Sequence, residues 1–386
     1  MYSVIPYGRQ DITDADIQAV VDVLRSDYLT QGPVVPAFEQ AVADYCGAGY
    51  AVAVNSATSA LHLACLALDV GTDDYVWTSP NTFVASANCA LYCGAKIDFV
   101  DIDPRTYNMS VEALHKKLVE AEREGALPKV VIPVHFAGQA CEMKEVRDLA
   151  DHYGFRLVED ASHAIGGNYL KEKVGNCRYS DITVFSFHPV KIITTGEGGM
   201  ATTNSPELAR KMQLLRSHAV TRESDEMIRT DRGALYYEQV GLGFNYRMTD
   251  IQAALGNSQL KRLDEFVARR HQIVEVYDQS LQNLPLTLPW QHPDTWSSWH
   301  LYVVHLNESH RRRQVTEQLR ATGILVNVHY IPVHLQPYYE RMGFAAGDFP
   351  EAEHYYEGTI SLPLFPAMTS SQQQQVIEML HKVMQS

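Results

Sequence analysis

The sequence has little of what a membrane, secreted or nucleic-acid-binding protein would need. No stretch approaches the ~18 consecutive apolar residues of a membrane span. Residues 1–6 show no basic start followed by an apolar run, so we expect no signal peptide. The formal net charge is −14, and there is no run of lysines and arginines that would suit a nucleic acid. These absences predict a cytoplasmic protein that binds neither membranes nor nucleic acids.

Cysteine is equally scarce, with six residues in 386 and no Cys-x-x-Cys pair. Such scattered cysteines are typical of free thiols in a reducing compartment. Cys89 and Cys93 can share one helix face, but a third and a fourth ligand are missing nearby. His329 and His334 stand five residues apart, a spacing that suits zinc poorly. We therefore expect no metal site.

What the sequence does contain is a strand–turn–helix pattern that repeats from residue 50 onward. Helical segments separate most of a series of short apolar runs, which lie at 51–54, 75–77, 96–100, 130–134, 156–158 and 183–187. Strands that are apolar throughout and alternate with helices predict an α/β fold with a mostly parallel sheet covered by helices. Such sheets bind ligands at the carboxyl ends of their strands. No Gly-x-Gly-x-x-Gly follows the first strand, so a dinucleotide-binding Rossmann domain is not expected.

The chain is longer than one core usually fills, so we expect two domains. A helix capped by Thr13 is predicted over 13–24, and a long one from Thr249 toward Leu281. Beyond Pro285 the pattern suggests a smaller α+β domain, built from 298–306, 312–322, 324–330 and 371–385. The predicted division is a large domain at 13–250 and a small C-terminal domain at 251–386, joined by residues 1–12.

The segment 185–191 carries the first chemical signal. It follows a predicted buried strand and ends at Lys191, where burying a charge is costly unless the lysine has a function. A lysine that forms a Schiff base needs a lowered pKa and a held, apolar position. Residues 196–199 then permit a tight reversal into another strand at 200–202. By itself the segment fits a surface lysine on a turn equally well.

A carboxylate at the end of another strand favours the catalytic interpretation. Asp160 follows the apolar run at 156–158, and a pyridoxal phosphate site needs such a carboxylate against the pyridine nitrogen. The negative charge keeps that nitrogen protonated, so that the ring can accept electrons. His163, three residues on, could lean against the ring or its phenolic oxygen. The structural alternatives are a helix cap for Asp160 and a core histidine for His163.

A phosphate cradle at a helix N-terminus would complete such a site. Residues 55–60 are small and open a predicted helix, so its first backbone N–H groups could hold a phosphate, namely those of Ala57, Thr58 and Ser59. The hydroxyls of Thr58 and Ser186 could add donors. Phe83 could stack on the cofactor ring, although core packing is the commoner role of such an aromatic.

Together these motifs resemble the DegT/DnrJ family of nucleotide-sugar aminotransferases, which have the type I aminotransferase fold. The likeness covers nearly the whole chain, in order and in spacing. Its motifs lie at 32–33, 55–58, 94–95, 100–103, 134–138, 159–161, 185–191, 245–248, 329–330 and 332.

The resemblance implies a role for each residue of the site. Lys191 would hold pyridoxal 5'-phosphate as a Schiff base and shuttle protons, and Asp160 would pair with the ring nitrogen. His163 stands where relatives often have glutamine, beside the cofactor together with Phe83. Asn245 would reach the phosphate from the other subunit of a homodimer. The remaining phosphate ligands would be Ala57, Thr58 and Ser186.

Within the family, the likeness is strongest to members that act in pseudaminic acid biosynthesis. It implies transfer of an amino group from L-glutamate to C4 of a UDP-4-keto-6-deoxy-N-acetylhexosamine. The sugar-nucleotide pocket would be lined by Tyr7, Asp27, Tyr28, Leu29, Thr30, Asn327, His329 and Tyr330.

Three alternatives remain open at this point. The enzyme could aminate another nucleotide 4-keto sugar, since relatives share most of these motifs. It could be a nucleotide-sugar dehydratase of the same fold, although those have a histidine where this chain has Lys191. It could also be a non-catalytic regulator, against which the complete set Lys191, Asp160, Ser186 and Asn245 argues.

Overall fold

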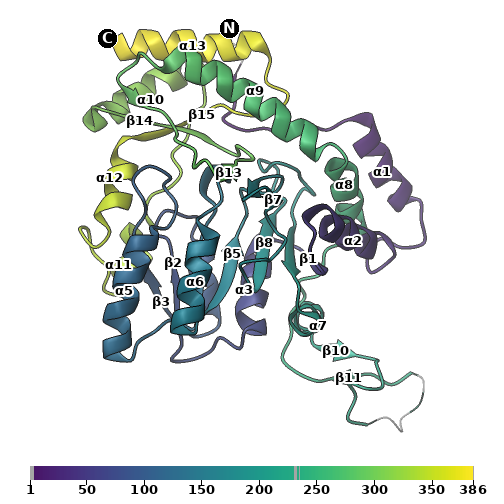
Figure 1. The fold of residues 1–386 in the computed structure, drawn as a ribbon. Helices are drawn as coiled ribbons and strands as arrows, with labels where there is room; N and C mark the ends of the chain where they lie inside the picture. The colour runs from purple at the N-terminus through teal and green to yellow at the C-terminus, as the bar shows by residue number, and fades with distance from the viewer. Residues whose placement is uncertain (1–3, 230–232, 234, 386) are drawn as a thin grey trace.

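The computed structural model describes residues 4–229, 233 and 235–385. Its centre is a seven-stranded sheet in the order β1-β9-β8-β5-β4-β2-β3 (Figure 1). Neighbouring strands pair in parallel except at β9, which is antiparallel to both β1 and β8. The strands are β1 (Tyr50–Val54), β2 (Tyr75–Thr78), β3 (Lys96–Phe99), β4 (Val130–Ile132), β5 (Arg156–Asp160), β8 (Ile182–Ser186) and β9 (Gly199–Thr203). The predicted mostly parallel sheet is therefore confirmed.

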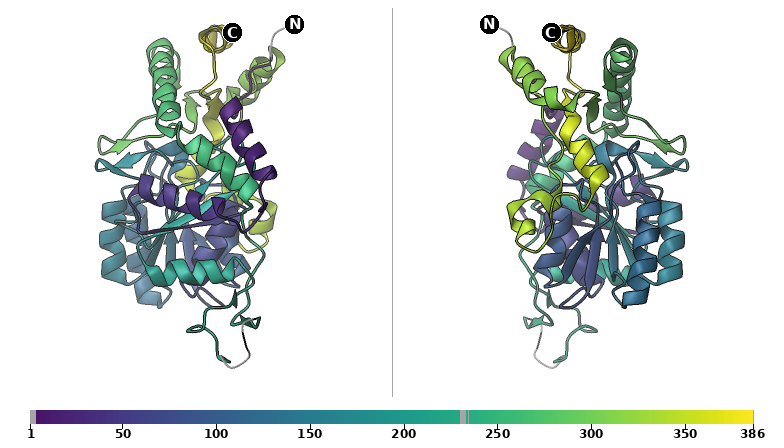
Figure 2. Two further views of the ribbon diagram at one scale, coloured as in Figure 1. Left: turned by 90° about the vertical axis from the view of Figure 1, so that its right-hand side faces the viewer. Right: turned by 90° about the vertical axis from the view of Figure 1, so that its left-hand side faces the viewer.

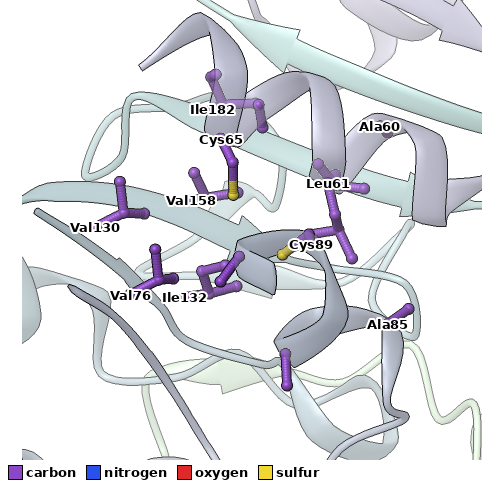
Figure 3. Packing of buried hydrophobic residues seen from close by; sticks show 14 of the residues in the cluster. Ala60, Leu61, Cys65, Val76, Ala85, Cys89, Val130, Ile132, Val158 and Ile182 are labelled. Atoms are coloured by element: carbon purple, nitrogen blue, oxygen red, sulfur yellow. The ribbon is translucent and has the colours of Figure 1, made fainter. Parts of the chain in front are cut away.

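Helices cover both faces of this sheet. In β1, Val52 and Val54 join one hydrophobic cluster, whereas Ala51 and Ala53 join the other. Because both faces are covered, β1, β5, β8 and β9 are buried over four or five consecutive residues, without the alternation of a half-exposed sheet. The first face is covered by α3 (Ala57–Ala67), α4 (Ala85–Tyr92) and α7 (Pro206–Leu215), and part of that packing is drawn in Figure 3. The second face is covered by α2 (Val34–Cys46), α5 (Val111–Glu124), α6 (Met143–Tyr153) and α8 (Asp250–Leu260).

A third hydrophobic cluster joins the C-terminal part to Ile5 near the N-terminus. It lies at the end of the molecule that is uppermost in Figures 1 and 2. Its helices and antiparallel sheet are α9 (Leu263–Leu281), α10 (Arg312–Ala321), α13 (Ser370–Gln385), β12 (Leu286–Thr287), β14 (Tyr302–Leu306) and β15 (Thr359–Leu362). The segment 324–330 contributes two isolated bridges, Ile5 to Ile324 and Asn327 to Ser361, and no strand. The division into domains at residue 250 stays a prediction.

The prediction of one long helix from Thr249 toward Leu281 is wrong, because the structure has two helices there. α8 ends at Leu260 and α9 begins at Leu263. The break is stabilised by Arg262, which donates 2.7 Å to the buried carboxylate of Asp16 and 2.9 Å to the carbonyl of Asp11. Asp16 also closes the capping box of Thr13 at the start of α1 (Asp14–Leu24). The tertiary ion pair thus overrides a helical pattern that runs on locally.

Short elements complete the fold. They are β6 (Asn168–Tyr169), β7 (Glu172–Lys173), β10 (Val220–Thr221), β11 (Glu238–Gln239), β13 (Thr295–Trp296), α11 (Pro337–Glu340) and α12 (Pro350–Gly358). The strands β10 and β11 belong to an arm that extends from the body at the bottom of Figure 1. Apolar side chains on this arm face solvent: Ile228, Leu235 and Leu242 are 88%, 91% and 80% exposed.

Candidate active site

A cavity of about 930 Å³ opens at the carboxyl ends of β1, β5 and β8, where ligands of such sheets bind. Its volume lies within the range of about 300–1,000 Å³ that is usual for small-molecule sites. Twelve residues named as site candidates from the sequence line it: Tyr7, Ala57, Thr58, Ser59, Phe83, Asp160, His163, Ser186, Lys191, Asn327, His329 and Tyr330.

Lys191 lies in the loop between β8 and β9, and its side chain reaches the cavity. The loop is folded onto itself, since the backbone N–H of Lys191 donates to the carbonyl of His188 at 2.9 Å. Burial lowers the pKa of Lys191 from its ordinary 10.5 to about 8, and the negative charge of Asp160 opposes this shift only in part. A neutral amine, which is the nucleophilic and basic form of lysine, is therefore accessible near neutral pH.

Asp160 is the last residue of β5 and is almost completely buried. Its Oδ1 accepts the backbone N–H of Ser162 at 3.0 Å, and its Oδ2 accepts the hydroxyl of Ser86 at 2.6 Å. These two donors fix the plane of the carboxylate. Ser86, on α4, was not found from the sequence, because a serine inside a helix carries no local signal for this contact.

The N-terminus of α3 forms one wall of the cavity. Ser56 caps the helix, and its hydroxyl accepts the backbone N–H of Ser59 at 3.1 Å. The N–H of Ser59 is therefore already used, and the free donors of the first turn are those of Ala57 and Thr58. Gly199 of β9 runs so close to this turn that a Cβ there would meet the backbone of Ser56 and Ala57 at 2.5 Å. The turn is thus held in place by the neighbouring strand.

These residues fit pyridoxal phosphate. Asp160 presents a buried, doubly hydrogen-bonded carboxylate, which suits a protonated pyridine nitrogen. Lys191 supplies an amine of lowered pKa in the same cavity. The first turn of α3 offers backbone donors to a phosphate, with the hydroxyl-bearing residue Ser186 on the same wall.

Three buried histidines surround the cavity and are uncharged. Burial, the charge of Lys191 and the nearby His329 lower the pKa of His163 well below its ordinary value. Burial and Lys191 likewise lower the pKa of His329 to about 3. The ring of the third histidine, His300, lies 4.3 Å from that of His163 between centroids and is tilted by 40°, and burial is the main cause of its lowered pKa. His300 was not found from the sequence, since only the fold brings it to the cavity.

His329, which also lines the cavity, belongs to a hydrogen-bond network. Its Nδ1 lies 2.8 Å from Ser361 Oγ, and its Nε2 lies 3.3 Å from Asn327 Nδ2. An amide nitrogen only donates, so Nε2 accepts and Nδ1 carries the hydrogen. Tyr7 lies over this imidazole, with ring centroids 5.3 Å apart.

Five residues assigned to the site from the sequence lie outside this cavity. Asn245 is exposed, and its carbonyl accepts from Asn55 Nδ2 at 3.4 Å, beside the cavity. The others are exposed in the connection between α1 and α2, namely Asp27, Tyr28, Leu29 and Thr30. Their assignments to the site stay predictions. Lining residues that were not assigned to the site from the sequence include His188, Glu197 and Gln252.

Among residues 4–229, 233 and 235–385, no group of three or more His, Cys, Asp or Glu side chains is arranged to hold a metal ion. All six cysteines are free thiols. Within the same described residues, no helix combines the length and the apolar character of a membrane span.

Comparison with known proteins identifies the family. A model of the DegT/DnrJ/EryC1/StrS aminotransferase family matches residues 10–381. The spore coat polysaccharide biosynthesis protein SpsC of Bacillus subtilis is 39% identical over 98% of this chain and 97% of its own length. The UDP-4-amino-4,6-dideoxy-N-acetyl-beta-L-altrosamine transaminase of Campylobacter jejuni is 37% identical over 94% and 93%. The GDP-perosamine synthase of Caulobacter vibrioides is 38% identical over 92% and 91%.

Solved structures agree with this result. Helicobacter pylori PseC, an aminotransferase involved in the biosynthesis of pseudoaminic acid, superposes with a TM-score of 0.90 at 31% identity, over 99% of this chain and 100% of its own. The PLP form of a putative sugar aminotransferase, Spr1654 from Streptococcus pneumoniae, gives 0.88 at 31% identity, over 99% of each chain. The chain therefore belongs to the DegT/DnrJ/EryC1/StrS aminotransferase family, has the type I aminotransferase fold and is a sugar aminotransferase.

Proposed function

We propose that this aminotransferase binds pyridoxal 5'-phosphate in the cavity and transfers the amino group of L-glutamate to C4 of a UDP-4-keto-6-deoxy-N-acetylhexosamine, in pseudaminic acid biosynthesis. The observation that carries the proposal is the cavity itself, where Lys191, with a pKa lowered to about 8, meets the buried carboxylate of Asp160 beside the start of α3. The choice of sugar is supported by the Campylobacter jejuni transaminase and by Helicobacter pylori PseC.

The residues that would hold the cofactor follow from the walls of the cavity. Asp160 would pair with the ring nitrogen, while Ala57, Thr58 and Ser186 would hold the phosphate. Phe83 would pack against the ring. When bound, the cofactor supplies an electron sink for the carbanion of the amino donor.

Lys191 would act as both the attachment point and the base. Its Nζ removes the α-proton of L-glutamate in the first half-reaction and delivers a proton to C4 of the sugar in the second. A base works best when its pKa lies near the working pH, and burial brings Lys191 into that range.

The sugar would bind on the side of the cavity formed by Tyr7, Asn327, His329 and Tyr330. These side chains are uncharged and carry both donors and acceptors, which suits the hydroxyl and amide groups of an N-acetylated sugar. The neutral state of His329, with its pKa lowered to about 3, keeps a second positive charge away from Lys191.

We further propose a homodimer with shared active sites. Asn245 and residues 27–30 lie outside the cavity of their own chain, as they would if they served the partner's. The exposed apolar side chains on the arm, Ile228, Leu235 and Leu242, support burial against a second copy.

The first test is the visible spectrum of the protein with pyridoxal phosphate, before and after L-glutamate. We expect a yellow lysine-bound form that bleaches when L-glutamate is added. Lys191→Ala should show neither the lysine-bound form nor the bleaching, although circular dichroism should show that it keeps its fold. A panel of UDP- and GDP-linked 4-keto sugars then tests the acceptor. The similarity to GDP-perosamine synthase makes a GDP sugar the second candidate. A protein that turns yellow but ignores L-glutamate would contradict the donor assignment and favour dehydration or another donor.

Hybrid dimers test the shared site. Lys191→Ala and Asn245→Asp are each expected to lack activity, the latter because a carboxylate would repel the phosphate. Mixed, refolded dimers regain activity if Asn245 acts across subunits, since one of their two sites then has both native residues. If Asn245 acts within its own chain, no mixed dimer has an intact site and none regains activity.

A further inference from the structure

The hydrogen-bond partners of His163 determine where its hydrogen lies. Its Nδ1 is 3.3 Å from the backbone nitrogen of Ala137, and its Nε2 is 3.1 Å from Tyr330 Oη. A backbone N–H only donates, so Nδ1 accepts with its lone pair. In a neutral imidazole the other nitrogen then carries the hydrogen, and Nε2–H donates to the oxygen of Tyr330.

The surrounding structure maintains this arrangement. Ala137 lies in the turn Phe136–Gly138 with a φ of 57°, which directs its N–H at the imidazole. A Cβ on Gly138 would come within 2.7 Å of Ser298 Oγ, so the turn is tightly packed. Ser298 also donates to the carbonyl of His163 at 2.7 Å. Burial keeps the imidazole neutral, because it lowers the pKa of His163.

Tyr330 is therefore left with a hydroxyl hydrogen to donate. Its oxygen already accepts from His163, and no other partner of that oxygen occurs among the described residues. The side chain lines the cavity, and the centroid of its ring lies 6.2 Å from that of Phe83 and 6.3 Å from that of Phe136. A partly buried hydroxyl that faces a binding cavity with an unused hydrogen is a donor for the ligand.

We propose that Tyr330, oriented by His163, donates a hydrogen bond to the phenolic oxygen of the bound cofactor. The inference rests on the proposed cofactor and goes beyond it, because it changes the roles of two residues. The best acceptor for a neutral O–H group is an anionic oxygen. On a ring placed between Asp160 and Lys191, that oxygen is next to the carbon that Lys191 attacks. Tyr330 thereby moves from the sugar pocket to the cofactor, and His163 acts through it as a positioning residue.

The consequence is a lowered pKa of the Schiff-base nitrogen on Lys191. The negative charge of the phenolic oxygen stabilises the proton on that nitrogen, and a donor to the oxygen withdraws part of this charge. Removing the donor should raise the nitrogen's pKa by about one unit, which is a tenfold change in the dissociation constant of its proton.

Other titratable groups face this pair, and the test has to leave them in place. Lys191 and His329 act on His163, whose ring also lies 4.3 Å from that of His300. Asp160 and Tyr7 act on Tyr330. Replacement of Tyr330 by phenylalanine removes a single oxygen and keeps the ring, so these neighbours keep their positions.

The experiment is a pH titration of the absorbance of the pyridoxal phosphate-loaded protein without substrate. We expect Tyr330→Phe to raise the midpoint of the transition from the protonated to the unprotonated form by about one unit. The matched control is Tyr338→Phe, a half-exposed tyrosine away from the cavity, with an unchanged midpoint. An unchanged or lowered midpoint in a loaded Tyr330→Phe protein overturns the inference. If that variant has an unchanged midpoint and loses only the half-reaction with the sugar, Tyr330 binds the sugar. Its assignment as a donor to the phenolic oxygen of the cofactor is then overturned as well.

The role of His163 is tested by a double-mutant cycle. His163→Leu should raise the midpoint in the same direction as Tyr330→Phe, and the double variant should equal Tyr330→Phe alone. A further rise in the double variant would show that His163 acts on the cofactor itself, which contradicts its positioning role. If the unmodified protein forms no yellow species with pyridoxal phosphate, the proposed cofactor fails first, and this inference fails with it.

Discussion

Replacing Gly199 by alanine should disturb the turn that opens α3. A Cβ on Gly199 would lie 2.5 Å from Ala57 N and 2.6 Å from Ser56 O, both of them backbone atoms. An ordinary van der Waals contact of a Cβ with another heavy atom is 3.4–4 Å long. One of the two backbone segments would therefore have to retreat by about 1 Å.

Neither segment can move without affecting the site. Gly199 pairs with Val54 of β1 on one side and with Ser186 of β8 on the other. Overpacking of this kind costs about 1–3 kcal/mol. If about 1.4 kcal/mol of it falls on the cofactor complex, the affinity drops tenfold. Ala57 and Ser186, which we propose as phosphate ligands, would be the first to move away from the cofactor.

The assay is a titration of the apoprotein with pyridoxal phosphate, followed by its absorbance, together with thermal unfolding of the apoprotein. We expect Gly199→Ala to weaken binding about tenfold and to lower the melting temperature by a few degrees. Gly71→Ala is the matched control, because a Cβ there meets nothing within 4 Å. Equal affinities for Gly199→Ala and the unmodified protein would refute the reasoning that β9 shapes the phosphate site.

Two further predictions concern the charges in the cavity. In the apoprotein the pKa of Lys191 is about 10.5 when the chain is unfolded and about 8 when it is folded. Burial of the charged lysine therefore destabilises the fold below pH 8, and this cost disappears as the pH rises from 8 to 10.5. The apo form of Lys191→Met should therefore be more stable than the unmodified apoprotein by about 1–3 kcal/mol at pH 7, as measured by chemical denaturation. This difference in the free energy of unfolding should shrink above pH 8, and a constant difference would contradict the lowered pKa. Asp160→Asn should slow the half-reaction with L-glutamate about 100-fold, and Ser86→Ala about tenfold, in rapid-mixing absorbance measurements. A larger loss in Ser86→Ala than in Asp160→Asn would mean that Ser86 does not act through Asp160.

The sequence by itself determined the class of fold, and the reason is the period of its apolar residues. A sheet buried on both faces favours strands without a polar face, and β1, β5 and β8 are each buried over four or five consecutive residues. The same pattern indicated where chemistry would lie. Asp160 and Lys191 come at or just after the carboxyl ends of two such strands, which are neighbours in the sheet.

Only the tertiary structure decided which side chains meet around those two residues. Ser86 and Asp160 are 74 positions apart, and His163 and Tyr330 are 167 apart. The break between α8 and α9 likewise depends on Arg262 finding Asp16, 246 positions away. Patterns in a sequence depend on the neighbours of a residue along the chain, whereas these hydrogen bonds depend on how the sheet, the helices and the C-terminal part of the chain pack together. The sequence thus pointed to a lysine and a carboxylate, and the packing of the chain decided which donors hold them.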